Sequence, residues 1–145
     1  MKVMSLILTG ITAVLIPTDC GRETEISGNA RDSILVFAEP AADSIVNGLN
    51  DNDYSAFSQY FDEQMKVSLS EKVFAQTRER ITGKIGRYRS RDVSRVIRKD
   101  QFIIVYYNAV FENESDVEVK VVFQKYGEKN LVSGLWFNSP GLREY

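Results

Sequence analysis

The chain has 145 residues, of which 43% are hydrophobic and 26% are charged, and its formal net charge is −2. This composition supports one ordinary globular domain with a sizeable core and excludes an intrinsically disordered chain. The sequence contains no histidine and a single cysteine, Cys20. It therefore excludes Ser-His-Asp and Cys-His catalysis, histidine-ligated zinc and an intramolecular disulfide.

Residues 1–19 have the layout of an export signal. Lys2 is followed by an apolar run from Val3 to Ile16 and then by Cys20 and a polar segment. The run is shorter than the roughly 20 residues that a membrane-spanning helix needs. A cysteine here resembles the lipid-attachment site of prokaryotic lipoproteins. We expect an extracytoplasmic protein, secreted or anchored in the cell membrane through Cys20. The alternative is a cytoplasmic protein in which the run is a buried strand.

The next residues predict a tether and then helices. Residues 20–33 are polar and contain glycine, serine and asparagine, which predicts a tether. We place the tether at residues 20–38, the domain at residues 39–140 and a tail at residues 141–145. Pro40 suits a first helical position, and the apolar residues after it recur at helical spacing. Asp53 is placed to cap a second helix over residues 54–61. Ser70 is placed to cap a third helix, which we expect to end at Gly83.

After Gly86 the apolar period changes from 3.6 to 2, which predicts strands. Four strand regions, 88–97, 101–112, 117–124 and 131–137, are separated by short polar turns. Helices that precede a run of strands indicate an α+β fold. We therefore predict three N-terminal helices packed on a curved, roughly four-stranded antiparallel sheet.

Several packing and turn signals resemble a known superfamily. They are Leu49-Asn50-Asp51-Asn52-Asp53-Tyr54, Phe61-Asp62-Glu63-Gln64-Met65, Gly86-Arg87-Tyr88, Val119-Lys120-Val121-Val122-Phe123 and Gly134-Leu135-Trp136-Phe137-Asn138-Ser139-Pro140. The chain resembles the nuclear-transport-factor-2-like superfamily, a cystatin-like α+β cone, and within it a small exported prokaryotic domain family of unknown function. The resemblance implies a pocket between sheet and helices. It implies no catalytic residues, since the superfamily hosts enzymes, binding modules and assembly domains.

Two sets of residues are candidates for a site. Isomerases of this cone shape place a carboxylic acid and a tyrosine in the pocket, and the corresponding residue types here are Asp62, Tyr54, Tyr106 and Tyr107. Tyr106 and Tyr107 alternate on a strand, so only one of them can face the interior, and the candidate pocket is Tyr54, Asp62, Tyr106 and Trp136, with Trp136 placed to stack on a ligand. Asp62 follows a short predicted helix, where we expect it to be exposed. In the basic segment, Arg87, Arg89 and Arg91 alternate and are expected to share one strand face. That face either binds an anionic partner or only protects a sheet edge from pairing.

These observations favour a non-enzymatic exported domain that binds a small apolar molecule or a partner protein. One alternative is a small isomerase- or dehydratase-like enzyme that uses an Asp/Tyr pair without a metal or cofactor. Another is a structural homodimer formed through the open sheet face. No nucleic-acid motif is present, and we predict no nucleic-acid partner.

Overall fold

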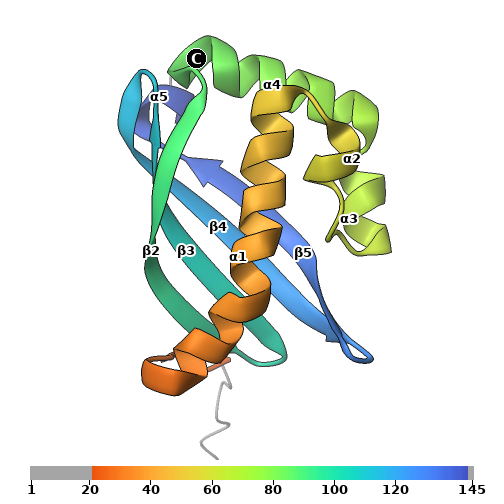
Figure 1. The fold of residues 1–145 in the computed structure, drawn as a ribbon, viewed down its shortest axis with the longest axis vertical. Coiled ribbons are helices and arrows are strands. Elements are labelled where there is room, and N and C mark those ends of the chain that lie inside the picture. Colours follow the sequence, from red (N-terminus) through yellow and green to blue (C-terminus); the bar gives the residue numbers. More distant parts are fainter. Residues whose placement is uncertain (1–20, 144–145) are drawn as a thin grey trace, which may run out of the picture.

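The structure is a computed structural model that describes residues 21–143. It has an α+β fold in which five antiparallel strands form one sheet in the order β1-β2-β3-β4-β5. The long helix α1 crosses one face of the sheet, α2 and α3 lie beside it, and α4 runs across its C-terminal end (Figure 1). The predicted fold class is therefore confirmed at this level. Cys20 and the predicted export signal lie outside the described residues.

Helix α1 spans Gly28–Asp51 and begins twelve residues before Pro40, so residues 28–38 of the predicted tether are helical. The reason is visible in its buried face. Ile34 and Ala38 extend the apolar stripe of Ala41 and Ile45 toward the N-terminus and pack into the same core. Burial of this face outweighs the backbone hydrogen bond that Pro40 cannot donate inside the helix.

Three further helices follow α1, and two of them begin at the N-cap residues that the sequence predicts. They are α2 (Tyr54–Phe57), α3 (Glu63–Ser68) and α4 (Glu71–Ile85). Asp53 accepts from the Ala56 amide, and Ser70 accepts from the Val73 amide, so both predicted N-caps are confirmed. Helix α2 is shorter than the predicted 54–61 helix, and α3 was not predicted. Helix α4 runs past Gly83 and ends at Gly86, whose φ of 82° suits glycine.

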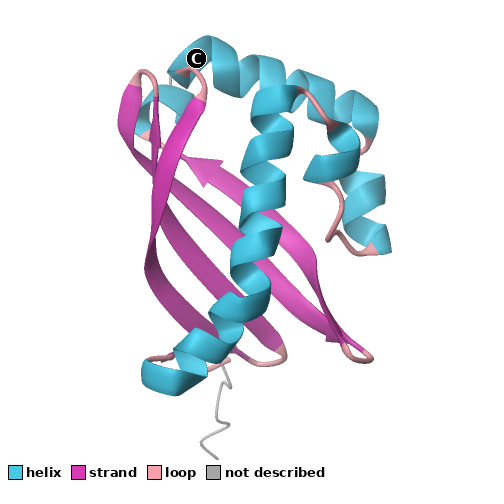
Figure 2. Cartoon of the chain, viewed as in Figure 1, coloured by secondary structure: helices cyan, strands magenta, loops and turns pink. Residues whose placement is uncertain are grey.

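The sheet is a meander of β2 (Tyr88–Lys99), β3 (Phe102–Phe111), β4 (Glu114–Tyr126) and β5 (Lys129–Asn138), preceded by the two-residue strand β1 (Thr24–Glu25) (Figure 2). The four longer strands agree with the prediction, whereas β1 was missed because two polar residues carry no periodic signal. The predicted tail is also different, because Pro140–Arg143 form the short helix α5.

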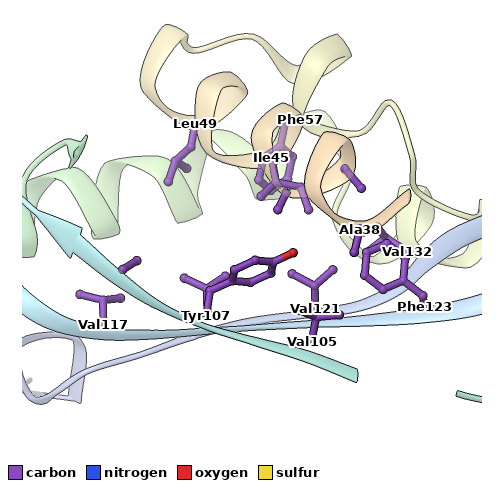
Figure 3. Close-up of a cluster of buried hydrophobic side chains, with 14 of the residues drawn as sticks. Ala38, Ile45, Leu49, Phe57, Val105, Tyr107, Val117, Val121, Phe123 and Val132 are labelled. Atoms are coloured by element: carbon purple, nitrogen blue, oxygen red, sulfur yellow. The ribbon is translucent and has the colours of Figure 1, made fainter. Parts of the chain in front are cut away.

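One main core lies between α1 and the inner face of the sheet, which is the face turned toward α1 (Figure 3). Val105, Tyr107, Val117, Val121 and Phe123 project into it from β3 and β4, so the predicted alternation of β4 is confirmed. A second, smaller cluster lies on the opposite face, which we call the outer face. It consists of Ile97, Ile104 and Val122, with Phe102 and Tyr106 packed against it.

Candidate functional site

The four predicted pocket residues do not meet in one pocket. Tyr54 lies at α2, where its hydroxyl donates to the Leu69 carbonyl at 2.8 Å and its ring packs on Phe74. Tyr106 and Trp136 lie on the outer face of the sheet, because the register pairs both of them with Lys120. The tyrosine that points into the interior is Tyr107 (Figure 3).

Asp62 is buried, with 4% of its surface exposed, contrary to the expectation that it is exposed. One carboxylate oxygen caps α3 by accepting from the Met65 amide at 2.7 Å. The other accepts from the Tyr126 hydroxyl at 2.8 Å, and this hydrogen bond raises the pKa of Tyr126. Since both oxygens are engaged in local contacts, the geometry favours a structural role for Asp62 over that of a general acid.

Asp62 and Trp136 do line one shallow hollow on the outer face. Its volume is about 330 Å³, and its floor is formed by Phe102, Ile104 and Val122. The hydroxyl of Ser133, which also lines the hollow, is buried without a hydrogen-bond partner in the described part of the chain. The sequence therefore identified two residues that lie together, but on the face opposite to the one expected.

The basic segment does not form one exposed face. Register shifts interrupt β2 between Tyr88 and Ser90 and again between Val93 and Arg95. The first shift places Arg91 beside Tyr88 on the inner face, where its side chain is only 8% exposed. Arg87 is exposed, and Arg89 is exposed and pairs with Glu112 at 3.5 Å.

Arg91 instead joins α1 to the sheet through a polar cluster that the sequence analysis missed. Its guanidinium contacts Glu39 at 3.1 Å and Asp43 at 2.7 Å, and it lies 5.2 Å from the centre of the Tyr107 ring. The Tyr107 hydroxyl and Glu39 Oε1 are buried without a hydrogen bond of ordinary geometry within residues 21–143. Burial and the nearby Glu39 carboxylate raise the pKa of Tyr107 well above its usual range. The available signal for this cluster was the spacing of Glu39, directly before the predicted helix, and Asp43, four residues later.

A further hollow is a groove of about 640 Å³ at the edge of the sheet. Strand β5 ends the strand order, and among residues 21–143 its outer edge is paired only at Val132, by the segment 60–62. Beyond Val132, the groove runs between β5 and α4 and reaches α5. Its apolar lining residues are Phe57, Leu69, Ile81, Leu135, Trp136, Phe137 and Leu142.

Two arginines give the apolar groove a cationic rim. Arg80 and Arg143 both line it, and both are exposed. Each donates to a backbone carbonyl, Arg80 to Leu142 and Arg143 to Ser139. Neither forms an ion pair with a carboxylate of residues 21–143. Apolar walls beside cationic groups suit a ligand that has an apolar body and an anionic end.

Two further searches concern the described residues only. Residues 21–143 contain no group of three or more cysteine or acidic side chains placed to hold a metal ion. In the same range, no helix has both the length and the apolar character needed to cross a membrane.

Comparison with known proteins gives a family without a known activity. Curated proteins show no match to the chain. A family model described as a protein of unknown function, DUF3887, matches residues 42–134, from within α1 to within β5. The match covers most of the helices and of the sheet, and the chain therefore belongs to the DUF3887 family.

Proposed function

We propose that this chain is a non-enzymatic binding domain that holds a single-chain anionic amphiphile in the groove between β5 and α4. The apolar groove with Arg80 and Arg143 at its rim is the observation that supports the proposal. Its volume of about 640 Å³ lies within the range of small-molecule sites. The walls would remove an acyl chain from water, which contributes about 0.8 kcal/mol for each buried methylene group.

We also propose that the fold is the nuclear-transport-factor-2-like cone and that the protein is exported. The order of helices and then a curved meander supports the first statement. The second is supported by the apolar run from Val3 to Ile16 and by Cys20 behind it. A binding role agrees with a groove that opens at the surface and with the structural contacts of Asp62.

Trp136 provides the assay, because it is the only tryptophan and lines the groove. Dodecanoate, added below its micelle concentration, is expected to shift the emission of Trp136 to shorter wavelength and to saturate. Thr77→Phe should abolish this response, because Thr77 is a half-buried residue of the groove wall.

The arginines are tested by comparing dodecanoate with dodecanol. The double variant Arg80→Gln, Arg143→Gln should bind dodecanoate about tenfold more weakly, since exposed ion pairs contribute up to about 1 kcal/mol each. Its affinity for dodecanol should be unchanged. Lys72→Gln, Lys84→Gln is the matched control, because both lysines are exposed on α4 and neither lines the groove. A wild-type chain that gives no saturable Trp136 response would refute the proposed ligand class.

A further inference from the structure

The outer face of the sheet carries a continuous row of alternating cationic and aromatic side chains. The register pairs Arg95 with Tyr106, Tyr106 with Lys120, and Lys120 with Trp136, across four neighbouring strands. The guanidinium of Arg95 lies 4.1 Å from the centre of the Tyr106 ring, and the ammonium of Lys120 lies 4.8 Å from that of Trp136. We call these four residues the cation–aromatic row.

An apolar row lies directly beside it, toward the β2–β3 turn. Ile97, Ile104, Val122 and Gly134 are register partners across the same four strands. The ring of Trp136 packs over Gly134, where an added Cβ would lie 2.5 Å from a ring atom. Even so, 53% of Trp136 is exposed. The Trp136 ring therefore rests on the strand at Gly134 and presents a large aromatic surface to solvent.

On β2 to β5, the outer-face residues from the cation–aromatic row to the β2–β3 turn include the cations Arg95, Lys99 and Lys120 and no carboxylate. Three carboxylates lie next to this area: Glu25 of β1 is the register partner of Ile97, Glu23 pairs with Lys99 at 3.3 Å, and Asp62 lines the hollow beside Trp136. The next row in the other direction contains two carboxylates and two amides: Asp92, Asn108, Glu118 and Asn138. Neither Arg95 nor Lys120 forms an ion pair within residues 21–143.

The chain reaches the fold at the same end of the sheet. Thr24 pairs with Arg98 and Glu25 with Ile97, and Gly21 lies against the Asp100 side chain in the β2–β3 turn. Only Gly21, Arg22 and Glu23 separate Cys20 from β1 in the sequence. Residues 1–20 include the apolar run that the sequence predicts to be membrane-directed. Any membrane attachment there would bring this end of the outer face close to the bilayer.

We propose that the outer face, with the cation–aromatic row at its centre, docks on the surface of an anionic phospholipid bilayer. Tryptophan and tyrosine are favoured at the headgroup level, where one side of the ring is apolar and the other is wet. Lysine and arginine near an anionic surface each strengthen association about fivefold at moderate salt. This proposal does not depend on the groove or on its ligand.

Vesicle binding tests this proposal with the chain from Gly21 onward, which contains the core residues that the structure describes. Circular dichroism first establishes that this shortened chain is folded. We expect it to co-float with vesicles of phosphatidylcholine and phosphatidylglycerol and to shift Trp136 emission to shorter wavelength. Lipids brominated on their acyl chains should quench that emission. Binding should weaken with added salt and be much lower on phosphatidylcholine alone.

Four variants separate the explanations. Arg95→Gln, Lys120→Gln should bind anionic vesicles about 30-fold more weakly. Arg95→Lys, Lys120→Arg should retain binding, and so should the control Lys72→Gln, Lys84→Gln, which removes the same charge from α4. Thr77→Phe should also retain vesicle binding, which distinguishes docking from extraction of a lipid chain into the groove. Equal losses in the Gln pair and its control would overturn the proposal. So would a concentration-dependent dimer that buries Trp136 without vesicles.

Discussion

Replacing Arg91 by glutamine is the sharpest test of the interior, because Arg89, two residues away in the same strand, provides a matched control. Arg91 is 8% exposed and contacts two carboxylates of α1, whereas Arg89 makes one exposed contact to Glu112. Removing one partner of a buried ion pair costs about 3–5 kcal/mol. The side chains of Glu39 and Asp43 are 41% and 59% exposed, so solvent screening lowers this cost. We expect Arg91→Gln to lower the free energy of unfolding by about 2 kcal/mol.

For Arg89→Gln we expect a loss of at most about 0.5 kcal/mol, which is typical of a surface substitution. Urea unfolding followed by circular dichroism measures both values, and an unchanged m-value would show that the unfolded state is comparable. Arg91→Lys should recover part of the loss, since lysine keeps the charge but not the forked geometry that reaches both carboxylates. Equal effects of Arg91→Gln and Arg89→Gln would refute the buried cluster as a link between α1 and the sheet.

Two further outcomes are expected. Tyr107→Phe should leave stability near neutral pH unchanged or raise it by up to about 1 kcal/mol, because the hydroxyl it removes is buried without a hydrogen bond of ordinary geometry. The pKa of Tyr107 is raised in the folded state, so the neutral hydroxyl is favoured there. This preference contributes to the free energy of unfolding below about pH 10. The contribution falls at higher pH, because the tyrosine then ionises in the unfolded chain. Thermal unfolding at several alkaline pH values should show a smaller fall in Tyr107→Phe, and a fall equal to wild type would contradict this account. Cys20→Ser in the full chain should release the protein from the membrane fraction without a change in thermal stability, because Cys20 precedes all the core residues of the described range 21–143. Unchanged membrane association of that variant, or wild-type protein confined to the cytosol, would contradict the lipid anchor.

The elements that the sequence predicted correctly are those marked by alternating buried residues or by a helix cap. The alternation of Val117, Val119 and Val121 identified the inner face of β4, and Asp53 and Ser70 identified two helix starts. These signals are local, because one turn or a few alternating residues determine them. The first half of α1 was missed for a different reason. The run from Ile34 to Ala38 is continuously apolar and so shows no helical period, and the residues before it are polar. Ile34 and Ala38 become helical because the sheet covers them.

The site could not be predicted in the same way, because it depends on the phase of the strands. Arg87, Arg89 and Arg91 would share a face in an uninterrupted strand, but a bulge at Arg89 turns Arg91 inward. A second bulge at Ser94 turns Arg95 outward, into line with Tyr106 and Lys120. A shift of one residue moves every later side chain to the opposite face. The sequence of β2 therefore shows that a basic strand is present, but the two bulges decide which arginine stabilises the core and which one is available to a partner.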